Sequence, residues 1–304
     1  MTGIKNPLVS IVTPTFNQAE YLVETIESVL AQDYSPIEYI VLDDGSTDQT
    51  AEILNRYDGK LRWERHPNMG QANTLNKGWT MSRGEILGYL SSDDCLKPQA
   101  VSEAVSALAR QPEVNVTYSD YFLTNNKSEI IRPFYAPDYS RQKLIEELIC
   151  QPGPGAFFRR TIFDALGGWH PDLRQMPDFE FWLRASDLGN FLRIPKLLAE
   201  SRIHESSQSF AKTSAFRAEE PVRVLTDFWS NLRNGKSSFD KNYSLASAYL
   251  LTGRLHLMSG RIILGLLRLG KAVSIKPKLL LSRRFWRTSI VALVRRFYYS
   301  LLFK

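Results

Sequence analysis

Short β-like runs alternate with segments of helical period through the first hundred residues, and this alternation restricts the fold more than any other feature. The β-like runs are residues 8–13, 37–42, 61–65 and 85–90. The helical segments that follow them are residues 20–31, 50–57, 71–81 and 99–110. Strands that alternate with helices pack as a parallel sheet covered by helices. We therefore expect a doubly wound, mostly parallel α/β sheet with helices on both faces.

The rest of the chain is less regular at first and then wholly helical. Its patterns indicate strands at 114–118 and 156–158 and helices at 141–150 and 178–188. The second of these helices is expected to place Phe181, Trp182, Ala185 and Leu188 on one face. From about residue 216 every pattern is helical. We therefore divide the chain into an α/β domain, residues 1–215, and a C-terminal helical region, residues 216–304.

Acidic pairs follow two of the expected strands at the point where each strand ends. Asp43 and Asp44 come after the second strand, and Asp93 and Asp94 come after the fourth. Ligands of such sheets bind beyond the carboxyl ends of the strands. Paired carboxylates there suit Mg²⁺ or Mn²⁺. Such a cation would lie between the carboxylates and a nucleoside diphosphate and would offset the repulsion between their negative charges. Taken alone, an acidic pair after a strand is more often two solvated turn residues.

Several motifs in a fixed order give the pattern a more specific meaning. They are VSIVTPTFN at 9–17, IVLDDGSTD at 40–48, NMG at 68–70, NKG at 76–78, GEILGYLSSDD at 84–94, GGWH at 167–170, DFEFWLR at 178–184 and RIH at 202–204. Together they resemble glycosyltransferase family 2, which has the GT-A fold, over about the first 210 residues. The resemblance implies an inverting glycosyltransferase of the hexosyltransferase type. It would move a sugar from a nucleotide-diphosphate donor to a hydroxyl of a glycan or lipid-linked acceptor, in polysaccharide biosynthesis for the cell envelope.

The resemblance also implies which residues bind the donor. Those assigned to the nucleotide are Pro14, Thr15, Phe16, Asp44, Asn76, Ser91 and Ser92. Phe16 would lie against the base, and Asp44 would hydrogen-bond to its edge, which favours UDP. Asp93 would bind Mn²⁺ or Mg²⁺, and His204 falls in a segment that approaches the metal or the diphosphate in related enzymes. A single histidine after a strand is more often structural, so both interpretations of His204 are kept.

Asp178 matches the general base of the family, six residues before Arg184. A positioned carboxylate accepts the proton of the acceptor hydroxyl as that hydroxyl attacks the anomeric carbon. Glu180 competes for this role, or assists it, and either acid would also suit the positive end of a helix dipole. Asp94 and Trp169 are expected to border the donor sugar or the acceptor.

Ser91 stands where the family often has a first acidic residue, so Asp93 would carry more of the metal binding. This departure leaves a second hypothesis open, a non-catalytic nucleotide-sugar-binding or scaffolding subunit of a glycan-assembly complex. Nucleotidyl transfer is a third class with a similar sheet. It ordinarily shows a glycine-rich basic loop after the first strand, and residues 13–17 have none.

The C-terminal region is strongly basic. Residues 241–304 hold 13 Lys or Arg and no Asp or Glu, whereas the preceding 240 residues hold 25 basic and 32 acidic residues. Basic residues interleave with aromatic ones at 283–287 and 295–299, as in helices that lie on anionic lipid. No nucleic-acid recognition motif accompanies the charge. An anionic membrane surface is therefore the expected partner, and nucleic acid is not.

Three further features concern the compartment. The N-terminus lacks the basic and apolar segments of a secretory signal, and the only cysteines are Cys95 and Cys150. No apolar run approaches the ~20 residues that span a bilayer. The expected location is cytoplasmic, peripheral on the inner face of the cell membrane.

Overall fold

The computed structural model describes residues 6–204, 212–231 and 238–289. Contacts between Cα atoms group these residues into two compact units. The first unit contains residues 6–139, 150–172 and 181–204. The second contains residues 140–149, 173–180, 212–231 and 238–289. The domain boundary expected at residue 215 stays a prediction.

The first unit is built on a nine-stranded sheet with the order β3-β2-β1-β4-β8-β6-β9-β5, in which β7 pairs with β6. The strands are β1 Val9–Thr15, β2 Ile37–Asp43, β3 Arg62–Arg65, β4 Ile86–Tyr89, β5 Cys95–Leu96, β6 Val114–Thr124, β7 Ile130–Phe134, β8 Phe157–Arg159 and β9 Asn190–Arg202. Strands β3, β2, β1 and β4 are parallel, and so are β6 and β9. The pairs β4–β8, β8–β6, β6–β7 and β9–β5 are antiparallel.

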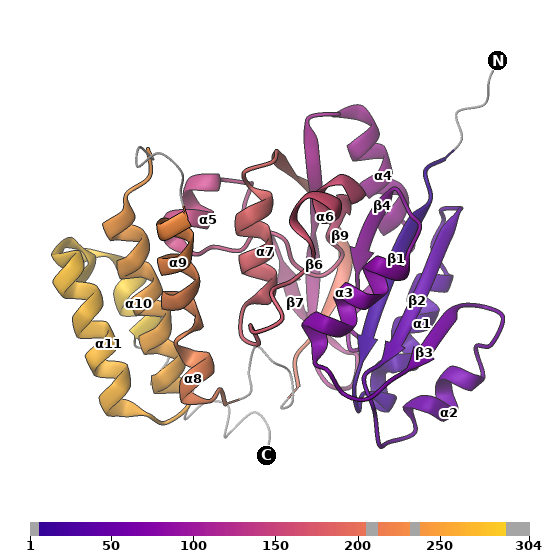
Figure 1. The fold of residues 1–304 in the computed structure, drawn as a ribbon, viewed down its shortest axis with the longest axis horizontal. Helices are drawn as coiled ribbons and strands as arrows, with labels where there is room; N and C mark the ends of the chain where they lie inside the picture. The colour runs from indigo at the N-terminus through magenta and orange to yellow at the C-terminus, as the bar shows by residue number, and fades with distance from the viewer. Residues whose placement is uncertain (1–5, 205–211, 232–237, 290–304) are drawn as a thin grey trace. The chain divides into compact units, whose positions relative to one another are not determined.

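Helices cover both faces of this sheet (Figure 1). They are α1 Ala19–Leu30, α2 Thr50–Asn55, α3 Gln71–Met81, α4 Ala100–Arg110, α6 Arg160–Leu166 and α7 Pro177–Ala185, the last of which begins in the second unit. Side chains on a strand alternate between the two faces. On β1, Val9 and Ile11 therefore pack in one hydrophobic core with α1, α2 and α4, whereas Val12 packs in another with α3, α6 and α7.

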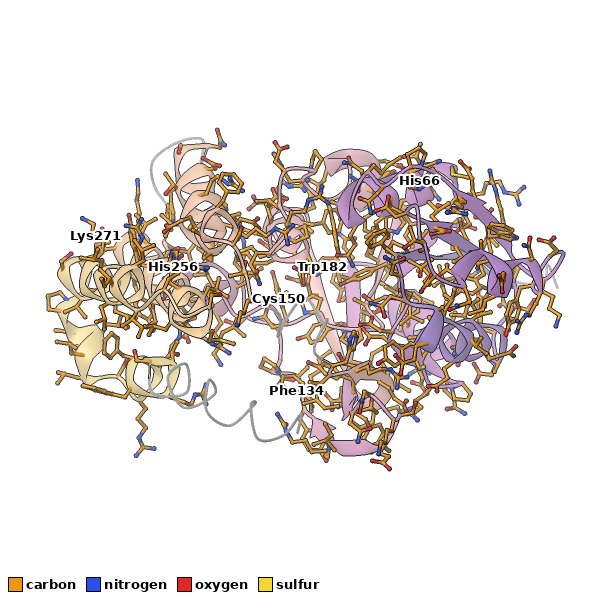
Figure 2. All side chains as sticks on the ribbon, turned by 90° about the horizontal axis from the view of Figure 1, so that it is seen from below. His66, Phe134, Cys150, Trp182, His256 and Lys271 are labelled. Atoms are coloured by element: carbon orange, nitrogen blue, oxygen red, sulfur yellow. The ribbon has the colours of Figure 1, made fainter. Side chains whose placement is uncertain are left out.

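Aromatic rings fill the second of these cores. Trp79 of α3 is fully buried, with ring centroids 5.3 Å from Phe158 on β8 and 5.8 Å from Phe181 on α7. Phe181 packs at 5.0 Å against Trp182, which is also fully buried (Figure 2). Phe158 on β8 also makes edge-to-face contacts with Phe181 and Trp182, and both stacked and edge-to-face contacts add to the free energy gained from burial. They anchor the C-terminal half of α7 to the sheet of the first unit.

The second unit is helical. It contains α5 Arg141–Glu147, α8 Ala215–Ala218, α9 Glu220–Asn231, α10 Lys241–Met258, α11 Ile262–Ile275 and the 3-10 helix η1 Pro277–Leu281. Helices α10 and α11 approach closely at two glycines, because a Cβ on Gly253 would lie 2.8 Å from Leu269 and one on Gly265 would lie 2.6 Å from Leu257. None of the helices in the described ranges combines the length and apolarity that crossing a bilayer requires.

The expected α/β fold with a helical C-terminal region is confirmed. Helix α3 has the expected bounds, and the strands expected in the first hundred residues are present with ends shifted by a few residues. Strands β5, β7 and β9 and helix α6 were not expected. The placement of Leu188 on the face of α7 is wrong, since α7 ends at Ala185 and Leu188 is 44% exposed. Helix α5 also ends early, at Glu147, where Leu148 takes a φ of 51°.

Candidate active site

The parallel register of β1 and β2 brings the first motif and the first acidic pair to one edge of the sheet. Pro14 lies opposite Leu42 and Thr15 opposite Asp43. The Asp44 N–H donates to the Thr15 carbonyl at 2.8 Å. The phenyl ring of Phe16 is 45% exposed just beyond this edge. An exposed aromatic ring beside backbone polar groups offers a base both a stacking surface and hydrogen bonds.

The Asp44 carboxylate holds the loop that follows β3. Its Oδ1 accepts from the Met69 N–H at 2.7 Å, and its Oδ2 accepts from the Gly70 N–H at 2.9 Å. Gly70 takes a φ of 85°, which glycine adopts at little cost. His66 Nδ1 lies 3.6 Å from Asp44 Oδ1. Each carboxylate oxygen accepts a second hydrogen bond, so these contacts are compatible with the predicted contact to a base.

Asp43 serves the turn between β2 and α2. It is fully buried, its Oδ1 accepts from the Ser46 N–H at 2.8 Å, and its Oδ2 lies 3.5 Å from Arg65 Nε. Asn17 ties the loop after β1 to the same turn. Its N–H donates to Ser46 Oγ at 2.9 Å, and its Oδ1 accepts from the Thr47 N–H at 2.8 Å. The two loops around the predicted nucleoside site are therefore one hydrogen-bonded unit.

The structure brings Asp93 and His204 together from the ends of β4 and β9. His204 Nε2 lies 2.8 Å from Asp93 Oδ2, and the two side chains are 6% and 18% exposed. The His204 ring packs 5.0 Å from the ring of Tyr21 on α1. The sequence predicted both residues for one metal site but gave no reason for their contact, which depends on the unexpected strand β9.

Arg202 connects the segment around Asp93 to the end of β9, a role that sequence reasoning missed. Its Nε donates to the Asp93 carbonyl at 2.9 Å, and its backbone N–H donates to Asp94 Oδ1 at 2.9 Å. The guanidinium also pairs with Glu24 on α1 at 2.7 Å and lies 4.6 Å above the ring of Tyr21. The RIH motif was the available signal, because its arginine precedes the histidine by two residues.

Asp94 does not share the environment of Asp93. Its burial, together with the charge of Asp93, raises the pKa of Asp94 well above its usual range, against the lowering effect of Arg202. The Asp94 N–H donates to the Ser91 carbonyl at 3.0 Å, which closes the turn that contains buried Ser92. Asp94 thus contacts Ser91 within the turn and Arg202 on β9, and the predicted contacts of Asp94 and the serines to donor or acceptor stay predictions.

Asn76 and Trp169 form a reciprocal pair. The Asn76 amide donates to the Trp169 carbonyl at 2.8 Å and accepts from the Trp169 N–H at 2.8 Å. A Cβ on Gly168 would lie 1.8 Å from Asn76 Oδ1, so only glycine fits there. The indole of Trp169 is 4% exposed, and its Nε1 has no hydrogen-bond partner among the described residues. The amide predicted for the nucleotide therefore anchors the GGWH segment.

Asp178 and Glu180 lie in the first turn of α7, in the part of that helix that belongs to the second unit. Burial raises the pKa of Asp178 above the usual range of an aspartate, although the backbone N–H groups of Phe179 and Asp178 itself lower it. A carboxylate with a raised pKa is a stronger base. The roles predicted for the two acids stay predictions.

Asp93 and His204 are hydrogen-bonded at 2.8 Å, and both are side-chain types that bind divalent cations. Neighbouring ligands of an octahedral ion with bonds of about 2.1 Å lie about 3 Å apart, so the two atoms would bind one ion in place of the proton that they share. A carboxylate with an imidazole suits Mn²⁺. In the described ranges, no three His, Cys, Asp or Glu side chains converge on one point. A cation held by two side chains leaves positions for phosphate and water.

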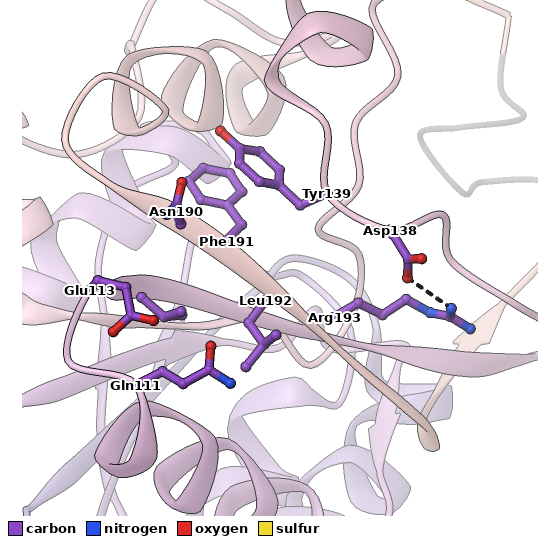
Figure 3. A pocket seen from close by; sticks show the side chains of 9 residues that line it. Gln111, Glu113, Asp138, Tyr139, Asn190, Phe191, Leu192 and Arg193 are labelled. Atoms are coloured by element: carbon purple, nitrogen blue, oxygen red, sulfur yellow. Dashed lines mark hydrogen bonds and ion pairs between the residues drawn. The ribbon is translucent and has the colours of Figure 1, made fainter.

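A shallow cavity of about 320 Å³ also lies in the first unit, between residues 111–114, 138–139 and 190–193 (Figure 3). It contains none of the residues predicted for donor or metal. Its Arg193 already pairs with Asp138 at 3.1 Å and with Asp120 at 2.8 Å. Because the charge that would recognise a ligand is neutralised, this cavity is not the candidate site.

Solved structures share the fold of the chain. A Staphylococcus aureus TarS fragment, 1–349, solved with UDP-GlcNAc, has a TM-score of 0.67 at 18% identity over 95% of this chain and 89% of that one. The mannosyltransferase PcManGT from Pyrobaculum calidifontis, solved with GDP-Man and Mn²⁺, has a TM-score of 0.58 at 19% identity over 97% of this chain and 88% of that one. The class that fold and site define is the GT-A-fold transferases.

The sequence comparisons name the family. The model of glycosyl transferase family 2 matches residues 10–167. An uncharacterized glycosyltransferase of Rickettsia typhi, RT0329, is 31% identical over 75% of this chain and 73% of its own length. Escherichia coli chondroitin synthase is 28% identical over 74% of this chain, which spans a third (33%) of that relative's length. The chain belongs to glycosyltransferase family 2 and is a glycosyltransferase.

Proposed function

We propose that this glycosyltransferase moves a sugar from a nucleoside-diphosphate donor to a hydroxyl of a glycan or lipid-linked acceptor, with inversion at the anomeric carbon. The observation that carries the proposal is the contact of Asp93 with His204 beyond the end of β4. It joins a carboxylate and an imidazole at the sheet edge where the first acidic pair also lies. The alternative of a non-catalytic subunit is less well supported, because this pair is intact despite Ser91.

The donor is proposed to be a UDP-sugar held by the loops after β1 and β2. The exposed ring of Phe16 offers a stacking surface, and Pro14, Thr15 and Asp44 lie on the same edge. Asp44 has oxygens free to accept one more hydrogen bond each, as the imide N–H of uracil would donate. The TarS fragment was solved with UDP-GlcNAc. PcManGT was solved with GDP-Man, so GDP-sugars belong in any test.

Mn²⁺ or Mg²⁺ is the proposed cofactor, with Asp93 and His204 as its protein ligands. When bound, a divalent cation stabilises the negative charge that develops on the departing diphosphate. This chain's residues prepare that position: Arg202 holds the Asp93 backbone, and Tyr21 packs against the His204 ring. Both ligands are mostly buried. Their side chains therefore keep the orientation in which the 2.8 Å spacing was observed.

Asp178 is the proposed general base. It would accept the proton of the acceptor hydroxyl while the hydroxyl oxygen forms a bond to the anomeric carbon and the bond to the diphosphate breaks. Attack from the face opposite the leaving group inverts the configuration. The raised pKa of Asp178 supports this role, because it strengthens the carboxylate as a base. Glu180, two residues on, is proposed as a helper.

The acceptor is proposed from the named relatives and the location from the charge of the sequence. The relatives include proteins named chondroitin synthase and hyaluronan synthase, which favours a polysaccharide as the acceptor. The excess of basic residues after residue 240 favours a peripheral position on an anionic membrane surface, at its cytoplasmic face. Of the two basic aromatic segments expected to contact it, 295–299 lies outside the described residues.

A thermal-shift screen of UDP-, GDP- and dTDP-sugars with Mn²⁺ tests the proposal without the acceptor. One nucleotide sugar at about a hundred times its Kd is expected to raise Tm by roughly 5–10 °C. EDTA should remove most of this shift, and the corresponding sugar 1-phosphate, which lacks the nucleotide, should give none. The proposal fails if no nucleotide sugar raises Tm, and the metal assignment fails if EDTA changes nothing.

A further inference from the structure

Helix α11 leaves an apolar stripe exposed. It buries Gly265, Leu269 and Ala272, the last two in one core with side chains of α10. On the remaining surface Ile263, Leu266 and Leu267 are 77%, 56% and 61% exposed. Leu281 at the end of η1 and Trp286 just after it are 88% and 53% exposed. With Ile262, which is 45% exposed, Ile263, Leu266 and Leu267 form what we call the α11 surface, and Leu281 and Trp286 are exposed apolar residues of the segment that follows it. Such a concentration of exposed apolar side chains indicates a contact with another body.

Four cations in residues 262–289 have no acidic partner in the part of the chain that the structure describes. Lys271, Lys278, Arg283 and Arg287 form no ion pair with any described residue. The other basic residues of the same segment are neutralised locally. Arg268 pairs with Glu219 at 2.9 Å, and Lys276 pairs with Asp240 at 2.5 Å. Asp240 is also the last acidic residue of the sequence. The unpaired positive charge and the exposed apolar side chains therefore belong to the same segment of the chain, residues 262–289.

We propose that the α11 surface docks on an anionic phospholipid bilayer, with its apolar side chains at the headgroup boundary and the four unpaired cations on lipid phosphates. The inference deepens the proposed membrane location and rests on it. An interfacial helix needs an apolar face flanked by cations rather than the length of a membrane span, and α11 has 14 residues. A second copy of this chain is disfavoured as the occupant, because a symmetric contact would bring like charges together.

Flotation of the full chain with vesicles tests the docking directly. Vesicles of phosphatidylglycerol with phosphatidylcholine should bind the protein. Vesicles of pure phosphatidylcholine should bind it with an affinity at least about tenfold lower. Adding salt to 1 M should release it, since screening shortens the reach of the charges. The double variant Ile263→Glu, Leu267→Glu should bind the anionic vesicles with an affinity at least about tenfold lower than that of the unsubstituted protein.

The matched control is Ile131→Glu on β7, which also replaces an exposed isoleucine (54%) by an acid and should bind like the unsubstituted protein. Three results would overturn the proposal. The first is equal binding of the unsubstituted protein to both kinds of vesicle, and the second is a dimer in light scattering that the double variant dissociates. The third is a lowered Tm of the double variant when the unsubstituted protein binds neither kind of vesicle. The last would indicate that the chain covers its own surface. Donor-induced thermal shifts should be unchanged in the double variant, so failure of docking and failure of sugar transfer give different results.

A second inference comes from a different observation, the buried carboxylate of Glu220 on α9. The side chain is fully buried, and it accepts hydrogen bonds from three consecutive backbone N–H groups. Its Oε2 accepts from Gln175 at 2.6 Å and from Met176 at 3.2 Å, and its Oε1 accepts from Arg174 at 3.0 Å. These residues immediately precede α7, whose first turn contains Asp178.

The geometry points to Glu220 as a positioning residue for Asp178. A buried carboxylate that accepts several N–H groups fixes the backbone, because each unpaired amide would carry a desolvation cost. The fixed segment enters α7 one residue before Asp178, so Glu220 sets the backbone position of the proposed base. This inference rests on the proposed role of Asp178. Within the described ranges, the hydrogen bonds and ion pair of Glu220 go to Arg174, Gln175, Met176 and Arg223, none of which is assigned to donor or metal.

Glu220→Gln tests the role, since glutamine keeps the shape but turns one acceptor into a donor that faces N–H groups. The assay measures release of nucleoside diphosphate from the nucleotide sugar that the donor screen selects. In Glu220→Gln, kcat should fall at least about tenfold, and the KM for the donor should stay unchanged. The acid limb of the pH–rate profile should shift. Glu220→Asp is the folding control if Glu220→Gln fails to fold. A normal kcat and acid limb in a folded variant would overturn the inference, whereas a normal kcat in Asp178→Asn would instead overturn the proposed base.

Discussion

Asp178→Asn is expected to bind the donor as the unsubstituted enzyme does and to lower kcat about a thousandfold. A positioned general base contributes a factor of about 10²–10⁴, and asparagine keeps the size of the side chain without its basic oxygen. Asp178 is not among the residues predicted to bind the nucleotide or the metal, and asparagine preserves the local packing. The thermal shift with the selected nucleotide sugar and Mn²⁺ should therefore stay within about 1 °C of the original value.

The pH dependence of kcat provides a further check on this assignment. Burial raises the pKa of Asp178, and only the ionised carboxylate accepts a proton. The rate should therefore be lost as pH falls through this raised pKa, at a higher pH than an ordinary aspartate would show. Glu180→Gln, in the same turn of α7, is the matched control and should keep the acid limb in place. If Asp178→Asn retains normal turnover, or if Glu180→Gln loses turnover about a thousandfold and shifts the acid limb, the base has been assigned to the wrong residue.

The parallel part of the sheet was predictable because its signals are local. Strands β1, β2 and β4 are short, largely apolar runs, β3 (RWER) is a short charged one, and each is followed by a helix in the sequence. Parallel neighbours need such a crossover. Helix α3 was predicted at its observed bounds. Gly70, which has a positive φ, is the residue before the helix, and Ser82, which is extended, is the residue after it. Because ligands bind beyond the carboxyl ends of parallel strands, the order of the strands alone predicts that Asp44 and Asp93 share one edge.

The second half of the sheet was less predictable, because its partners are far apart in sequence. Strand β9 pairs with β6 from Val114 opposite Asn190 to Thr124 opposite Arg202, so the paired residues are far apart in the sequence. Strand β5, which pairs with β9, has only Cys95 and Leu96. Runs this short, or mixed with charged residues as β9 is, carry little periodicity. The contact of His204 with Asp93 depends on β9, so the sequence proposed a shared site without showing how it forms.

Two of the predicted site residues have side chains that hydrogen-bond to the backbone of other residues. Asp44 and Asn76 were expected to face the donor, and the structure shows both holding neighbouring backbone, at Met69 and Gly70 and at Trp169. No pattern in the sequence identifies which amides a side chain will meet after folding. The role of Arg202 was missed for the same reason, since its partners come from α1 and from the turn after β4.

Asp93→Asn is expected to remove the dependence of donor binding on Mn²⁺ and to lower kcat by a factor of about 10²–10³. Asparagine keeps the shape and can still hydrogen-bond to His204, but it loses the charge that a cation requires. Charge stabilisation by a bound metal contributes several kcal/mol, about tenfold in rate for each 1.36 kcal/mol. The check is a pair of titrations with the selected nucleotide sugar, one with Mn²⁺ and one with EDTA, which should coincide in the variant.

Ser91→Asp is the complementary control, because it restores the acidic residue that the family often has at this position. It should tighten Mn²⁺ binding or leave it unchanged, whereas Asp93→Asn must weaken it. His204→Ala should resemble Asp93→Asn in its response to Mn²⁺, since the two side chains lie 2.8 Å apart and are proposed to bind one ion. A variant Asp93→Asn that still gains donor affinity from Mn²⁺ would place the cation elsewhere. A gain that survives in His204→Ala alone would leave Asp93 as ligand and return the histidine to a structural role.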